Sequence, residues 1–189
     1  TGVTGSFTVP TLNVPEGDDP QALYAVATAM GLDWLVCQNG GIVTGIIATL
    51  QNGTETFTAY TFGFPGSTIL ISDFTVSAGD NITVNVTATN ATSGTVVITN
   101  QSTNQTVSEV VPSGPLCLEE ADVLIEFYNL DGTQVPFADF GTLNTTGASA
   151  QTSSGPLGFS GTTTFDLEQN GTVLTSVSAS NSSVQITFL

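Results

Sequence analysis

The 189-residue chain contains no lysine, no arginine and no histidine, against sixteen aspartates and glutamates. No side-chain ion pair can form. Nucleic-acid binding is disfavoured because phosphates are held mainly by Lys and Arg, and an anionic lipid surface repels the chain for the same reason. The carboxylates repel one another less once protonated, which indicates an acidic habitat. A compositional bias of the source lineage would leave the same trace.

Long apolar runs and metal-binding clusters are also missing. No stretch of 18 apolar residues occurs, so the sequence predicts no membrane span, and its start resembles a mature protein without a leader. Because the chain has no histidine, it lacks the usual ligands for zinc, copper and haem, and it cannot form a Ser-His triad. Glu119, Glu120 and Asp122 could hold calcium, but no Asp-x-Asp-x-Asp-Gly loop is present. We expect an acidic loop, no metal and no cofactor.

Cys37 and Cys117 are the only cysteines. In a secreted protein a disulfide between them is expected, and closing so long a loop would contribute roughly 4 kcal/mol on the entropic model. Two buried free thiols are the alternative.

Nine of the twelve asparagines stand in Asn-x-Ser/Thr context, which indicates a secretory route and a glycoprotein at the cell surface. A period of two along residues 81–87 turns Ile82, Val84 and Val86 into the core and the asparagines outward. Sugars would then cover a sheet face, and any functional surface must lie elsewhere. The acceptors are Asn52, Asn81, Asn85, Asn90, Asn100, Asn104, Asn144, Asn170 and Asn181.

Runs rich in Val, Ile, Thr and Phe alternate with turn signals, and 40% of the residues are hydrophobic. This pattern predicts an all-β, antiparallel β-sandwich of one domain. Residues 21–30 are Ala-rich and helix-like in propensity but short, and we interpret them as a strand. The other expected strands are 7–9, 42–50, 56–62, 68–76, 82–88, 95–99, 106–111, 123–128, 162–167, 173–177 and 184–189.

Residues 1–15 contain two prolines and precede an acidic turn, so we interpret them as an extended N-terminal arm or edge strand, with 16–189 as the sandwich domain. The apolar residues of this arm are candidates for contacts in an assembly. They are Val3, Phe7, Val9 and Leu12.

Five segments, in order along nearly the whole chain, together resemble the glutamic peptidase (eqolisin) family. The resemblance implies an acid-active, secreted lineage with a concanavalin-like, jelly-roll type of β-sandwich. The segments are Val-Thr-Gly-Ser-Phe-Thr-Val-Pro at 3–10, Gly-Leu-Asp at 31–33 with Cys37-Gln38, Leu116-Cys117 with Ala121, Val-Pro-Phe-Ala-Asp-Phe at 135–140, and Asp-Leu-Glu-Gln-Asn-Gly at 166–171.

The resemblance implies an active site in which a Gln and a Glu face each other across a concave sheet. The carboxyl group activates water, and the amide stabilises the oxyanion. Counting from the cysteines, Val43 stands at the Gln position and Asp122 at the Glu position. Ala29 replaces a Trp of the family pattern, and residues 60–65 replace its Trp-x-Glu-Trp-x-Pro stretch. Losing one oxyanion donor costs two to three orders of magnitude in rate, so we expect no enzyme.

The resemblance also implies one further strand before the Val-Thr-Gly segment, and its absence would leave a sheet edge open. We therefore predict a non-catalytic, glycosylated structural protein, a subunit of an extracellular filament made of copies of itself. Residues 1 to about 15 of one copy would complete the sheet of the next by donor-strand complementation.

Two alternatives remain open. One is an acid peptidase with a rearranged dyad, in which Asp122 works with Asp33 or Glu126. The other is a carbohydrate-binding domain with an aromatic stacking platform. Its candidates are Trp34, Tyr60, Phe62 and Phe64.

Overall fold

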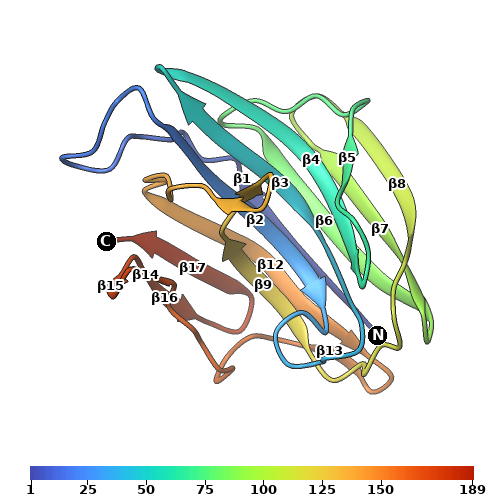
Figure 1. The fold of residues 1–189 in the computed structure, drawn as a ribbon. Coiled ribbons are helices and arrows are strands. Elements are labelled where there is room, and N and C mark those ends of the chain that lie inside the picture. The colour runs from blue at the N-terminus through green and yellow to red at the C-terminus, as the bar shows by residue number, and fades with distance from the viewer.

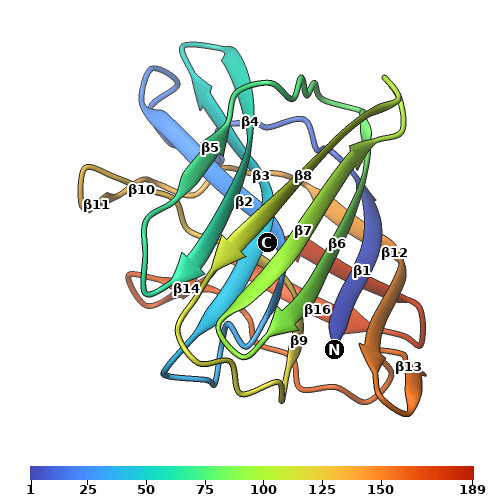
Figure 2. The ribbon, with the colours of Figure 1, turned by 90° about the vertical axis from the view of Figure 1, so that its right-hand side faces the viewer.

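The computed structural model describes residues 1–189, and its regular elements are strands alone. Two antiparallel sheets form stacked layers, which Figures 1 and 2 show from two sides. The predicted all-β antiparallel sandwich is thus confirmed. No helix long and apolar enough to cross a bilayer is present.

The larger sheet has eight strands and the smaller one five. The larger runs in the order β16 (Thr175–Ala179), β17 (Ser183–Phe188), β12 (Thr142–Thr152), β1 (Gly2–Thr8), β6 (Asn81–Asn90), β7 (Ser93–Asn100) and β8 (Gln105–Pro112), with β13 (Gly155–Leu157) paired to β12. The smaller runs in the order β5 (Ile69–Ile71), β4 (Thr54–Phe64), β3 (Gly41–Gln51), β2 (Leu23–Leu32) and β9 (Ala121–Glu126). Two short hairpins complete the fold, β10 (Asn129–Leu130) with β11 (Thr133–Gln134) and β14 (Glu168–Gln169) with β15 (Thr172–Val173).

The main core lies between the sheets, where 31 buried residues form one cluster. Ile82, Val84 and Val86 of β6 are buried in it, while Asn81 and Asn85 face solvent, as the period of two predicts. Strand β2 is buried on both of its faces, because a second apolar cluster covers the other side of the smaller sheet. A strand buried on both faces has no polar alternation, which explains the helix-like appearance of residues 21–30.

Strand β1 corrects the prediction of an N-terminal arm. It lies at the centre of the larger sheet and pairs with β6 on one side and β12 on the other. Val3, Phe7, Val9 and Leu12 are buried in the chain's own core. Because these side chains and the backbone of β1 are already used, they are not free to complete a neighbouring copy.

Two other strand predictions differ from the structure, and one long strand was not predicted. Residues 162–167 form an exposed irregular segment, and within 68–76 only β5 is a strand. Strand β12 was not predicted, because it is built largely from Thr, Asn, Gly, Ala and Ser, with Leu143 as its one large apolar residue. Its pairing with β1 and β17 stabilises it where local propensity does not.

Candidate functional site

A cleft lies on the face of the smaller sheet that points away from the main core. Alternate residues of β2, β3, β4 and β9 line it, and a cavity of about 180 Å³ opens there. We call this surface the aromatic cleft. It consists of Ala27, Ala29, Val43, Ile47, Tyr60 and Leu124, with Trp34, Phe62 and Tyr128 packed against them.

Val43 and Asp122 lie at one level of this face, on either side of Gly31. Gly31 of β2 is the register partner of Val43 on β3 and of Asp122 on β9. With two strand spacings between them, their Cα atoms are roughly 10 Å apart. A Cβ on residue 31 would lie 2.8 Å from the Ile42 carbonyl oxygen. The glycine therefore keeps the floor between the two positions free of a side chain.

Asp122 is 8% exposed, and its carboxyl group accepts a hydrogen bond of 3.1 Å from the backbone N–H of Trp34. Burial raises the pKa of Asp122 from 3.8 to about 7, and the Trp34 N–H offsets part of this effect. The neighbouring carboxyl groups of Glu120 and Asp33 contribute to the same rise. Asp122 is therefore mainly protonated, and so neutral, well below pH 7.

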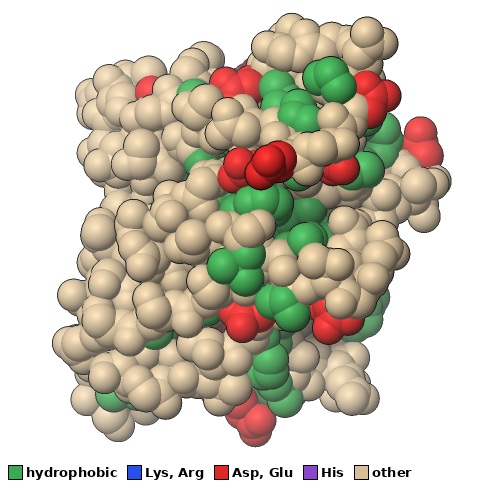
Figure 3. Space-filling model, turned by 90° about the vertical axis from the view of Figure 1, so that its left-hand side faces the viewer, with side chains coloured by type: hydrophobic (Ala, Val, Ile, Leu, Met, Phe, Trp, Pro, Cys, Tyr) green, Lys and Arg blue, Asp and Glu red, His purple; other side chains and the backbone are tan.

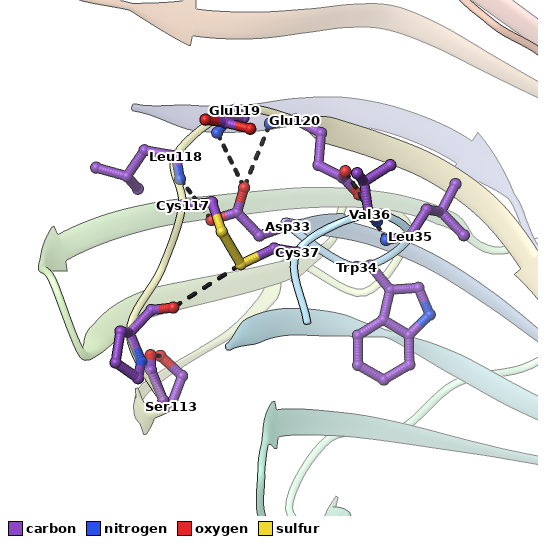
Figure 4. Close-up of a disulfide and its surroundings, with 12 residues drawn as sticks. Asp33, Trp34, Leu35, Val36, Cys37, Ser113, Cys117, Leu118, Glu119 and Glu120 are labelled. Carbon is purple, nitrogen blue, oxygen red and sulfur yellow. Dashed lines mark hydrogen bonds between the residues drawn. A yellow bond between two sulfur atoms is a disulfide. The ribbon is translucent and has the colours of Figure 1, made fainter. Parts of the chain in front are cut away.

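The two loops beside Asp122 are joined by the disulfide between Cys37 and Cys117, whose Cα atoms are 6.0 Å apart. The buried Asp33 carboxylate accepts N–H bonds of 2.7 to 3.3 Å from the three consecutive residues 118–120 (Figure 4). In return, Glu120 accepts N–H bonds from Leu35 and Val36. This reciprocal bracing fixes the turn that carries Trp34.

Glu126 anchors the aromatic wall of the cleft. It accepts hydrogen bonds from the Tyr60 hydroxyl and, at 3.1 Å, from the indole Nε1–H of Trp34. Burial raises the pKa of Glu126, while the two hydrogen bonds lower it. The Trp34 ring packs edge-on against Phe62 at 5.4 Å between centroids. The wall is thus held by both hydrogen bonds and ring packing.

Comparison with known proteins decides the family. Residues 1–188 match the profile described as the Peptidase A4 family. The chain belongs to this family. Aspergillopepsin-2 of Aspergillus niger is 31% identical over 206 aligned residues, which cover 100% of this chain and 73% of that relative. Scytalidopepsin B of Scytalidium lignicola is 34% identical over 139 residues, covering 69% and 52%.

Solved structures of the same family have the same fold. The crystal structure of aspergilloglutamic peptidase from A. niger superposes with a TM-score of 0.84 at 32% identity, over 88% of this chain and 99% of that one. Scytalido-glutamic peptidase with a transition state analog inhibitor gives 0.86 at 26% identity, over 100% and 92%. The resemblance to the glutamic peptidases inferred from the sequence is confirmed.

The prediction that the chain is not an enzyme is wrong. Its family is a family of peptidases, and its relatives and structural neighbours are named as peptidases. The prediction rested on Val43 and Asp122 together with Ala29 and residues 60–65, whereas the family match rests on residues 1–188. These substitutions do not remove the cleft and the buried carboxyl group of a peptidase fold.

Asp33 and Glu126, the two partners suggested for Asp122 in a rearranged dyad, are hydrogen-bonded to other groups, as Glu120 is to the N–H groups of Leu35 and Val36. Asp33 is bound to the loop at 118–120, and Glu126 is bound to the aromatic wall. The carboxyl group that contacts Asp122 is instead Glu120. The spacing of two residues was the signal that could have identified it, because Glu120 directly precedes β9 and side chains two positions apart in an extended segment point to the same side.

The other predicted sites have different surroundings. No group of three or more His, Cys, Asp or Glu side chains is arranged to hold a metal ion. Tyr60 is 4% exposed and its hydroxyl is engaged, so it offers no open stacking face for a sugar. Trp34 and Phe62 belong to the wall of the cleft, and Phe64 lies at the exposed end of β4.

Eight of the nine glycan-acceptor asparagines are exposed, and Asn100 is fully buried. The Asn100 amide donates hydrogen bonds to the Thr75 carbonyl oxygen at 3.1 Å and to the Asp80 carboxylate at 2.8 Å. The exposed acceptors lie on the larger sheet or in hairpin turns, and none belongs to the aromatic cleft. They are Asn52, Asn81, Asn85, Asn90, Asn104, Asn144, Asn170 and Asn181.

Proposed function

We propose that this chain hydrolyses peptide bonds in acid, with Asp122 as the reacting acid and Glu120 as its partner. One observation carries the proposal: a buried carboxyl group, protonated below about pH 7, lies at the family's Glu position beside a second carboxyl group. Two adjacent carboxyl groups of which one is protonated can divide the roles of acid and base. The names of the relatives and the inhibitor bound to one of them support a peptide substrate.

The chemistry follows from these two groups. A water molecule gives a proton to the Glu120 carboxylate while the water oxygen bonds to the peptide carbonyl carbon. The Asp122 carboxyl donates a hydrogen bond to the carbonyl oxygen and then passes its proton to the leaving nitrogen as the C–N bond breaks. Val43 supplies no donor to the oxyanion, so turnover should be about 10²- to 10³-fold slower than with an amide at this position.

The cleft also restricts the substrate. Its walls are apolar and aromatic, and the chain carries sixteen acidic side chains and no basic ones. Peptides with apolar side chains and without negative charge fit this surface best, because an acidic peptide is repelled. Figure 3 shows a different face of the molecule, the one that carries β14 to β17, where a band of apolar side chains also has carboxylates along it.

We further propose that the chain works outside the cell as a glycoprotein. The disulfide and the eight exposed acceptor asparagines support this proposal. Glycans at these positions would leave the aromatic cleft open. Assembly into a filament through residues 1–15 is not proposed, because β1 already lies within its own sheet.

Digestion of an acid-denatured protein at pH 3 to 6 tests the proposed function. The wild-type chain should release peptides slowly, and Asp122→Asn should lower the rate at least about 100-fold because the amide cannot transfer a proton. Asp131→Asn, in the exposed turn between β10 and β11, is the matched control and should leave the rate unchanged. Equal cleavage by the wild type and Asp122→Asn would remove Asp122 from the reaction.

A further inference from the structure

Glu126 is a half-buried carboxyl group for which the chain contains no counter-ion. It lines the cavity of about 180 Å³ in the aromatic cleft. Its two hydrogen-bond donors, the Tyr60 hydroxyl and the Trp34 indole, are both neutral. The chain has no Lys, Arg or His, so no side chain of its own can neutralise this carboxylate. Because a carboxylate removed from water is costly unless it is paired, a cation supplied from outside the chain would be stabilised here.

The aromatic rings beside Glu126 also suit a cation. Trp34, Phe62 and Tyr128 line the same cavity, and each is partly exposed. The planes of Trp34 and Phe62 stand at 84° to each other, so their two ring faces form a corner. A cation over the face of an aromatic ring is attracted by its quadrupole, and several such rings together hold alkylammonium groups. The cavity therefore combines ring faces with a carboxylate.

The cavity lies along the cleft from the reacting groups. Glu126 is the register partner of Ala27 on β2, whereas Asp122 is the register partner of Gly31. These two levels are roughly 13 Å apart along the strand, at about 3.3 Å per residue. Asp122 is not among the residues that line the cavity. An extended peptide bound at Asp122 can therefore reach the cavity with a side chain remote from the bond that reacts.

We propose that this cavity is a subsite for a basic side chain, Lys or Arg, of the peptide that is cleaved. The apolar stem of that side chain lies against Ile47 and the aromatic rings, and its charged end pairs with Glu126. This inference rests on the proposed function, because it names the substrate of the aromatic cleft. Another copy of this chain cannot supply the side chain, since the sequence contains neither Lys nor Arg.

Trp34 reports on the subsite, because it is the only tryptophan of the chain and lines the cavity. Its fluorescence is titrated at pH 7 with end-blocked apolar octapeptides that carry one lysine, moved through each position in turn. The Asp122→Asn variant is used so that the peptides stay intact. The best lysine peptide should bind at least about tenfold more tightly than its norleucine counterpart, which has the same stem without the charge. Equal affinities at every position would overturn the proposal.

Glu126→Gln, made in the same Asp122→Asn background, locates the source of the preference. It removes the charge and keeps an oxygen that can accept a hydrogen bond, so the preference for lysine over norleucine should fall about tenfold. Glu109→Gln is the matched control, because Glu109 is exposed on β8 and its loss removes the same charge elsewhere. It should leave the preference unchanged. Equal loss in both variants would show a general attraction to the acidic chain and overturn the assignment to Glu126.

Tyr128→Leu provides a second test if Glu126→Gln lowers the folded fraction measured by circular dichroism. Tyr128 lines the cavity with its side chain partly exposed, and leucine keeps that wall apolar without the ring. The lysine peptide should therefore bind several-fold more weakly, and the norleucine peptide should not. Unchanged affinity for the lysine peptide would contradict an aromatic subsite.

Hydrolysis by the wild-type chain at pH 6 separates this inference from the proposed function. Lysine in place of norleucine should lower KM and leave kcat nearly unchanged, because a remote contact holds substrate and transition state alike. Tighter binding of lysine peptides without any hydrolysis would refute the proposed function and leave the subsite as a binding site. Hydrolysis with the same KM for both peptides would refute the subsite and leave the proposed function.

Discussion

The aromatic cleft and the outer face of the larger sheet are built from the same kind of strand, yet they differ in what lies between their apolar residues. On the outer face, β6 presents exposed Asn81, Asn85 and Thr87 to solvent. In the cleft, the corresponding alternate positions hold buried apolar residues and two carboxyl groups, Asp122 and Glu126. An antiparallel sheet needs only one buried face, so burial of the second face indicates a use beyond folding.

The two faces also differ in the electrostatic environment of their carboxyl groups. Asp122 and Glu126 of the cleft have raised pKa values because burial disfavours their charged forms. Groups shifted in this way concentrate at functional sites. The three predictions below test whether the contrast between the two faces is real, beginning with the largest expected effect.

The pH dependence of stability should depend on Asp122. Its pKa is about 7 in the folded chain against 3.8 ordinarily, so the folded state holds this proton more tightly than the unfolded state. The associated stabilisation is complete below about pH 4 and is lost as the pH rises through 7, a change of up to about 4 kcal/mol. Urea unfolding at pH 3 to 8 should show Asp122→Asn losing much less stability than the wild type over this range.

Asp131→Asn serves as the reference for this measurement, because Asp131 is exposed in a hairpin turn. Its stability curve should run parallel to that of the wild type. A smaller decline should persist in Asp122→Asn, since Glu126 also has a raised pKa. If Asp122→Asn and the wild type decline in parallel, the Asp122 carboxyl is not buried as the structure has it.

Restoring an amide at residue 43 should raise peptide hydrolysis. Val43→Gln would place a hydrogen-bond donor on the cleft face opposite Asp122, across the bare floor at Gly31. An oxyanion donor contributes about 10²-fold or more in rate, so kcat/KM at pH 4 should rise about a hundredfold. Ile47→Gln puts the same amide further along β3 and should give no gain. A Val43→Gln variant that folds but is no faster would contradict the proposed geometry.

The sandwich could be predicted from the alternation of residues, but particular strands could not. Strand β6 was identified because Ile82, Val84 and Val86 alternate with polar residues. Strand β12 was missed because its position depends on the backbones of β1 and β17 rather than on its own apolar pattern. Strand β1 was assigned as an arm, because a short Pro-flanked segment carries no signal of the partners on its two sides.

The candidate site was predictable only where counting along the chain sufficed. Counting residues along the sequence from the cysteines assigned Val43 and Asp122 to the two catalytic positions of the family. The register around Gly31 brings both residues to one level of the sheet. The contacts of Trp34 with Asp122 and Glu126 span 88 and 92 positions, and no local spacing encodes them. Raised pKa values depend on such burial and could not be derived from composition.

Glycan occupancy provides the prediction with the smallest energetic effect, and it tests the outer face directly. Asn85 projects from β6 into solvent, whereas the Asn100 amide is buried and both of its N–H groups are donated. A sugar on the amide nitrogen replaces one of its two N–H groups, so Asn100 cannot carry a glycan without losing a buried hydrogen bond. Mass spectrometry of the glycoprotein should therefore find sugar on Asn85 and none on Asn100. Asn85→Gln should remove one glycan and leave stability nearly unchanged, whereas a glycan on Asn100 would show that modification precedes the folding of β7.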